Sequence, residues 1–169
     1  MSAIRAKDTK PEMLVRKYLW AHGFRYRLNH GRLPGRPDMV LRKFRTCIFV
    51  NGCFWHGHKL RYESDNENNN VDVKALESSV CCKIPKTNTD FWVSKITRNK
   101  ERDKDVQHKL AQMGWHCITI WECELKPAVR EATLRSLSYT LNSIFLDNQR
   151  VKRYQFDLDS MGRIAADES

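Results

Sequence analysis

The segment Asn51-Gly-Cys-Phe-Trp-His-Gly-His58 gathers two adjacent aromatic residues, two histidines and a cysteine within eight residues. Imidazole exchanges protons near neutral pH, so a histidine here can act as a general base. Cys53 and His58 carry the sulfur and nitrogen ligands that suit zinc. Further candidate ligands follow at Cys81, Cys82 and Cys123. The segment therefore indicates a catalytic or metal-binding site, with buried cysteines that hold no metal as the alternative.

Asp38 is the first carboxylate that points to nuclease chemistry. It ends the stretch Leu33-Pro-Gly-Arg-Pro-Asp38, at the start of a predicted strand and within the most basic part of the chain. A carboxylate there can hold a divalent cation against a DNA phosphate, although aspartate after proline is also common in turns. The Pro-Asp pair resembles the start of the PD-(D/E)xK nuclease motif. The next strand reads Cys47-Ile-Phe-Val-Asn51 and lacks the second acid and the lysine, so the general motif is incomplete.

Asp103 lies on the apolar face of a helix that we predict over residues 89–112. The positions of that face advance by alternating steps of four and three residues, and they are Trp92, Ile96, Asn99, Asp103, Val106, Leu110 and Met113. A carboxylate that faces inward has to be paired, hydrogen-bonded or bound to a metal. A structural ion pair with a nearby Arg or Lys explains the position of Asp103 as well as a functional site does.

The elements that must position these residues alternate between helix and strand. Thr9-Lys-Pro-Glu12 has the N-cap, early proline and glutamate of a helix start, and predicts a helix that runs to about His22. We expect this helix to bury Leu14, Val15, Tyr18 and Leu19. Strands are predicted at 24–28, 39–42, 46–51 and 116–121, and a last helix at 127–145. This order predicts an α/β domain with a mixed sheet between helices.

The chain of 169 residues is long enough to bury a core, and we expect one domain over 1–169. Residues 59–80 hold four Asn and five acidic residues with little periodicity, which predicts a surface insertion. Residues 150–169 predict a weakly defined tail.

The positive charge is concentrated near the N-terminus. Residues 1–45 hold twelve Lys and Arg against three acidic residues, which accounts for nine of the ten net positive charges. Such asymmetry favours binding to nucleic acid through its phosphates, although a solvated basic face is the alternative. The sequence shows neither a signal peptide nor a membrane span, so we expect a cytoplasmic protein without membrane contact, whose six cysteines stay reduced.

Five segments together resemble the very-short-patch repair (Vsr) endonuclease family. They are AIRAKDTKPEMLVRKYL, LPGRPDMV, IFVNGCFWHGH, IPKTNTDFWVSKITRNKERD and GWHCITIWEC, and they cover roughly Ala3–Cys123 in order, apart from the insertion. The resemblance implies a restriction-endonuclease-like fold with a structural zinc. It also implies Mg²⁺-dependent cleavage of one strand of double-stranded DNA, 5′ to the T of a T·G mismatch that arises when 5-methylcytosine deaminates. A cytosine-5 methyltransferase is the implied companion, and we expect the enzyme to act as a monomer in the bacterial cytosol and nucleoid.

The resemblance also assigns roles to individual residues. Asp38 matches the Mg²⁺-binding aspartate, with the backbone carbonyl of Val50 as a second contact. His56 matches the histidine that activates water, Asp103 the aspartate that orients a histidine, and Glu12 an active-site glutamate that also fits the capping box. The aromatic residues that enter the duplex would be Phe54, Trp55 and Trp92, and Arg36 would also bind DNA. The zinc ligands would be Cys53, His58, Cys123 and one of the two adjacent cysteines, with Cys82 preferred over Cys81.

Three departures from the family pattern limit these expectations. Asn51 stands at the position of a second active-site histidine, and an amide cannot transfer a proton at neutral pH. The sequence begins at Met1 without the longer basic arm of relatives, and the insertion at 59–80 interrupts the zinc ligands. Two alternatives therefore remain. One is a restriction-type nuclease that acts on matched duplex, and the other is a zinc-stabilised DNA-binding protein that no longer cleaves.

Overall fold

The computed structural model describes residues 7–28, 30–60, 63–64, 71–72 and 81–167. Its main sheet has four strands in the order β1 (Arg27–Leu28), β2 (Met39–Leu41), β3 (Thr46–Asn51) and β6 (His116–Trp121). The pairs β1–β2 and β2–β3 are antiparallel, whereas β3–β6 is parallel. The prediction of an α/β protein with a mixed sheet is confirmed, and β3 and β6 have the predicted bounds.

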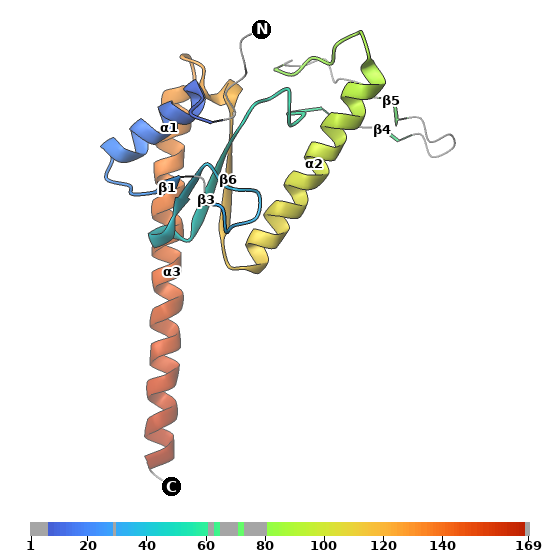
Figure 1. The fold of residues 1–169 in the computed structure, drawn as a ribbon. Helices are drawn as coiled ribbons and strands as arrows, with labels where there is room; N and C mark the ends of the chain where they lie inside the picture. Colours follow the sequence, from blue (N-terminus) through green and yellow to red (C-terminus); the bar gives the residue numbers. More distant parts are fainter. Residues whose placement is uncertain (1–6, 29, 61–62, 65–70, 73–80, 168–169) are drawn as a thin grey trace.

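Helices cover both faces of this sheet. Helices α1 (Lys10–Ala21) and α3 (Arg130–Asp167) lie on one side, and α2 (Thr89–Gln112) lies on the other (Figure 1). Successive residues of a strand point to opposite faces, and the core divides accordingly. Met39, Leu41, Ile48 and Ile120 pack with the first and third helices, whereas Val40 and Cys47 pack with Leu110 of α2.

Local sequence signals fix the first two helices. Thr9 is the N-cap of α1 and its hydroxyl accepts the Glu12 N–H at 3.4 Å, as the capping box predicts. Helix α1 ends at its C-cap His22, and α2 has the predicted bounds. Leu14 and Tyr18 are half-buried rather than buried, because they pack at the margin of the core cluster.

Other boundaries differ from prediction. Phe24 was expected in a strand, but its N–H bonds the carbonyl of Leu19 at the end of α1 and its ring packs on Phe44. The last helix begins at Arg130 and its backbone continues to Asp167, through most of the predicted tail. On α2, Met113 was expected in the core stripe but is 47% exposed, because it is the C-cap, beyond the end of the helix.

The segment 59–80 lies mostly outside the described residues. Within it, β4 (Glu63–Ser64) and β5 (Val71–Asp72) form an antiparallel pair. Two short 3₁₀ helices, η1 (Arg42–Phe44) and η2 (Glu122–Leu125), complete the elements. Among the described helices, none combines the length and apolar character needed to cross a membrane.

Candidate active site

The predicted catalytic residues meet in one cavity at the carboxyl ends of the parallel strands β3 and β6. The cavity has a volume of about 840 Å³, and Glu12, Asp38, Asn51, His56 and Asp103 all line it. They come from both sides of the sheet, since α1 supplies the glutamate and α2 supplies Asp103. Only the folded chain brings together residues that lie up to 91 positions apart in sequence.

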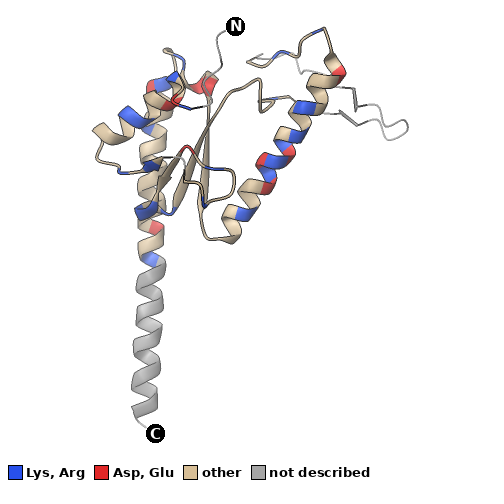
Figure 2. Ribbon diagram, in the orientation of Figure 1, with Lys and Arg blue, Asp and Glu red and all other residues tan. Residues whose placement is uncertain are grey.

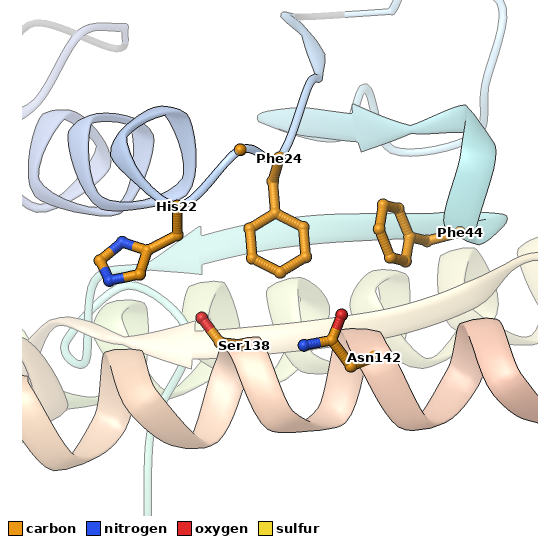
Figure 3. A pocket seen from close by; sticks show the side chains of 6 residues that line it. His22, Phe24, Phe44, Ser138 and Asn142 are labelled. Atoms are coloured by element: carbon orange, nitrogen blue, oxygen red, sulfur yellow. The ribbon is translucent and has the colours of Figure 1, made fainter.

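A second hollow, of about 280 Å³, is separate from this chemistry. It lies between the end of α1 and α3, where the ring of His22 and the side chain of Asn142 border Phe24 and Phe44 (Figure 3). None of the predicted site residues lines it.

Asp38 is held at the cavity wall by the strand beside it. The Val50 N–H donates a hydrogen bond of 2.7 Å to the carboxylate of Asp38. The pKa of Asp38 is raised to about 6, chiefly by burial and also by nearby Glu12, against the lowering effects of the Val50 hydrogen bond, Arg16 and His56. Burial destabilises the ionised form of this carboxylate, and a bound cation would stabilise it. The contact with Val50 is through its amide, and the metal-binding role of its carbonyl stays a prediction.

His56 and Asp103 form a direct pair, with 2.5 Å between the histidine Nδ1 and the aspartate Oδ2. When Nδ1 carries the proton that this bond requires, Nε2 keeps its lone pair and can accept a proton. The alternative explanation of Asp103 was an ion pair with Arg or Lys; within the part of the chain that the structure describes, its partner is His56 instead. The other polar residue on that helix face, Asn99, donates its side-chain N–H to the carbonyl of Trp55 at 2.8 Å.

Four side chains beside the cavity form a compact group suited to a metal. The ligand atoms of Cys53, His58, Cys81 and Cys123 all lie within 4.8 Å of one another. The three sulfurs are 3.7, 3.3 and 3.4 Å, respectively, from the Nδ1 of His58. Zinc bonds of about 2.3 Å to sulfur and 2.0 Å to nitrogen in a tetrahedron place these atoms about 3.5 Å apart. The residues therefore fit a tetrahedral zinc.

Cys81 joins this group, and the preferred candidate Cys82 does not. The Sγ of Cys82 lies instead against the carbonyl of Phe54 at 3.8 Å, and the side chain is 3% exposed within an apolar cluster. The preference for Cys82 is thus corrected: the two adjacent side chains leave the backbone in different directions, and only one meets His58.

The thiols of the group are electrostatically dependent on each other. The pKa of Cys53 is raised to about 12, chiefly by burial and also by the neighbouring thiols of Cys123 and Cys81, although a hydrogen bond with the Cys123 backbone lowers it. Metal binding requires deprotonated sulfur, so a cation would have to supply the stabilisation that burial removes. The ring of His58 is fixed by stacking on Trp121, with ring centroids 4.1 Å apart and planes 9° apart.

The three predicted DNA-entering aromatics form one cluster beside the cavity. The rings of Phe54, Trp55 and Trp92 have mutual centroid distances between 5.2 and 5.9 Å. Two further residues, which the sequence reasoning missed, extend the cluster. Phe91 is 58% exposed and contacts Trp92, and the ammonium of Lys95 lies 5.1 Å from the centroid of Trp55. Their spacing of four residues on α2 was the available signal.

Cations border both the cluster and the cavity. Arg36, predicted to bind DNA, is exposed and lines the cavity together with Arg102, which the sequence analysis did not select. Arg102 also borders a groove of about 580 Å³ on α2, beside Lys95 and Arg98. Lys and Arg recur along this helix (Figure 2). The cavity thus opens toward positively charged side chains.

The comparisons with known proteins point to one family of DNA endonucleases. The family model of DNA mismatch endonuclease Vsr matches residues 1–62. The Type II nicking enzyme V.NmeAIP of Neisseria meningitidis is 47% identical over 75% of this chain and 76% of its own. The Type II nicking enzyme V.XorIIP of Xanthomonas oryzae is 37% identical over 81% and 88%, respectively. DNA mismatch endonuclease Vsr of Escherichia coli is 35% identical over 75% and 69%.

These similarities, together with a cavity that joins an acid, a histidine–aspartate pair and bordering arginines, define a DNA endonuclease. The chain belongs to the Vsr family of DNA mismatch endonucleases.

Proposed function

We propose that this enzyme nicks one strand of duplex DNA 5′ to the T of a T·G mismatch, in a Mg²⁺-dependent hydrolysis. The observation that carries the proposal is the His56–Asp103 pair, which shares one cavity with Asp38 and adjoins the aromatic cluster. The proposal includes a fold for this chain that is related to that of restriction endonucleases. Relatives called nicking enzymes and a relative called a mismatch endonuclease support the two halves of the proposal, single-strand cleavage and mismatch recognition.

In the proposed chemistry, one group of residues holds the metal ion and a second group activates the attacking water. Asp38, with the Val50 carbonyl and Glu12 nearby, provides the oxygen ligands that Mg²⁺ prefers. Bound there, Mg²⁺ would neutralise phosphate charge and make phosphorus more electrophilic. The Nε2 of His56 accepts the proton of the attacking water as the water oxygen bonds to phosphorus, and Asp103 holds the opposite nitrogen and stabilises the charged ring. The bond from phosphorus to the leaving sugar oxygen breaks, and that oxygen takes a proton from water. Asn51 contributes a hydrogen-bonding amide rather than a titrating group.

The aromatic cluster supplies the proposed preference for a mispair. Inserting Phe54, Trp55 and Trp92 between base pairs costs a few kcal/mol of unstacking, and less at a mismatch. The same duplex geometry then brings the neighbouring phosphate toward Arg36 and Arg102 at the cavity. We assign zinc, held by Cys53, His58, Cys81 and Cys123, a structural role beside the cluster.

The proposed substrate implies a cellular setting. T·G mismatches arise by deamination of 5-methylcytosine, so we propose a companion cytosine-5 methyltransferase. The enzyme would act as a monomer on chromosomal DNA in the bacterial cytosol.

A nicking assay tests the proposal directly. Duplexes with one T·G pair in varied flanking sequence, and matched T·A controls, are incubated with enzyme and Mg²⁺ and resolved on denaturing gels. We expect a single nick 5′ to the T, lost in Asp38→Ala and His56→Ala and retained in Asp105→Ala, which alters an exposed carboxylate of α2. Equal cleavage of matched duplex would indicate a restriction-type enzyme. Mismatch binding without cleavage would indicate a DNA-binding relative, and unchanged cleavage in both variants would refute the assigned site.

A further inference from the structure

Helix α1 contains a buried ion pair whose acid faces the active-site cavity. Arg16 and Glu12 are 5% and 4% exposed, and the Nη2 of Arg16 lies 3.0 Å from the Oε2 of Glu12. The other terminal nitrogen of Arg16 contacts the carboxylate of Asp8 at 2.5 Å. Asp8 in turn donates its backbone N–H to the same Glu12 oxygen at 3.1 Å. Glu12 thus belongs to a closed network of three charged residues.

This network is costly for the fold. The free energy lost when two charges are removed from water often exceeds the free energy gained from their attraction. Replacing such pairs with apolar residues is therefore often neutral or stabilising. The Nε of Arg16 is also buried without a hydrogen-bond partner among the described residues. Asp8 adopts a left-handed φ of 57°, a conformation that costs roughly 1 kcal/mol or more for a residue other than glycine. Core packing alone therefore does not explain why this helix buries an arginine.

The cavity offers the explanation. Glu12 lines it together with Asp38, so its carboxylate must keep one orientation close to another acid. Its Oε1 is bonded to the Thr9 hydroxyl at 3.0 Å, and its Oε2 receives Arg16 and the Asp8 N–H. The arginine bridges Glu12 and Asp8 with its two terminal nitrogens, a planar geometry that lysine cannot reproduce.

We propose that Arg16 is a positioning residue of the active site, whose guanidinium, braced by Asp8, fixes the Glu12 carboxylate at the cavity wall. The role rests on the proposed function in one respect, since it assumes that Glu12 takes part in cleavage. Arg16 does not line the cavity, so it acts through Glu12 rather than on DNA.

The test separates nicking rate from DNA affinity. Single-turnover nicking of a T·G duplex is measured for wild type, Arg16→Met, Arg16→Lys, Glu12→Gln and the double variant Glu12→Gln/Arg16→Met. We expect Arg16→Met to lower the maximal rate about 10- to 100-fold, the size of a small misplacement, with the half-saturating enzyme concentration changed less than about threefold. Arg16→Lys keeps the charge without the planar fork, and its rate should fall between those of Arg16→Met and wild type. Lys17→Met, on the exposed side of the same helix, is the matched control and should retain its maximal rate.

The double variant gives the decisive comparison. If Arg16 acts through Glu12, Arg16→Met adds no further loss in the Glu12→Gln background. The proposal is wrong if the loss of nicking rate in the double variant equals the product of the losses in the two single variants, or if Arg16→Met keeps the full rate. Crystal structures of Arg16→Met and Arg16→Lys add a readout independent of cleavage, with Glu12 reoriented in the first and displaced to a smaller extent in the second. If Glu12 keeps its orientation in Arg16→Met, the proposal is wrong, whether or not the enzyme cleaves DNA. If wild type does not nick T·G DNA, the proposed function is wrong instead, so the two failures can be told apart. Arg16→Lys serves where Arg16→Met fails to fold.

Discussion

Replacing Asp38 with asparagine is expected to stabilise the Mg²⁺-free protein while it abolishes cleavage. Burial, the largest cause, raises the pKa of Asp38 from 3.8 to about 6. Each pKa unit corresponds to about 1.4 kcal/mol, so the ionised carboxylate costs the folded state at most about 3 kcal/mol at pH 7. The residue is partly exposed, and the asparagine oxygen still accepts the Val50 N–H, so we expect a net gain of about 1–2 kcal/mol. For a chain of this length that gain raises Tm by about 4 °C.

The gain depends on pH in a defined direction. Well below pH 3.8 the carboxyl is protonated in both the folded and the unfolded chain, and it does not destabilise the folded state. Between pH 4 and 6 the unfolded chain loses this proton first, so the stability that wild type draws from the neutral form declines as pH rises through the folded pKa of about 6. The full penalty is present at pH 7.5, and the asparagine variant escapes it.

Thermal melts at pH 4.5 and pH 7.5, without added Mg²⁺ and without chelators that would remove zinc, measure this difference. The Tm advantage of Asp38→Asn should be full at pH 7.5 and fall to about a third of that value at pH 4.5. Asp105→Asn, which alters an exposed pair with Lys109, should change stability by less than about 1 kcal/mol at either pH. An equal Tm difference at both pH values, or a less stable Asp38→Asn at pH 7.5, would refute the electrostatic reasoning.

Two further predictions concern the neighbouring groups. Cys81→Ser should lower the zinc content of purified protein, measured by elemental analysis, from about one per chain towards zero, whereas Cys82→Ser should retain the metal; equal content in the two variants would contradict the ligand assignment. Asp103→Asn should slow single-turnover nicking by about 10²–10⁴-fold, because the amide no longer fixes the tautomer of His56, while affinity for mismatched DNA stays within a few-fold; a rate near that of Asp105→Asn would show that the pair does not serve the reaction.

Residues with local signals were predictable from the sequence. The bounds of α2 follow from a long periodic segment, and those of β6 from a short apolar run between a glycine and charged residues. Asp103 stood out because it interrupts an apolar face, and the structure answers the anomaly with His56, which lies 47 positions away. The inward position was visible in the sequence, but the partner came from the family resemblance rather than from periodicity.

Features set by tertiary geometry were not predictable in this way. Cys81 and Cys82 are chemically identical, and which of the two side chains meets His58 depends on the three-dimensional backbone geometry at that point. Arg16 was counted with the basic surface near the N-terminus, but it is buried in the network with Glu12 and Asp8. Its charge is therefore paired with carboxylates inside the protein and does not contact DNA phosphates. A charge count cannot distinguish these two uses of an arginine.

The turn after β3 links the proposed structural metal to the chemistry. Cys53 and His58 bracket the aromatic pair and His56, and backbone hydrogen bonds from His56 to Gly52 and from His58 to Cys53 close the segment into consecutive turns. A metal held at both bracketing residues would therefore fix the register of everything between them. Its loss would move His56 away from Asp103 and would move Phe54 and Trp55 away from Trp92, although none of these side chains is a proposed ligand of the metal. The proposed catalytic geometry and the proposed mismatch recognition would thus depend on one short segment, and a metal bound there would affect both.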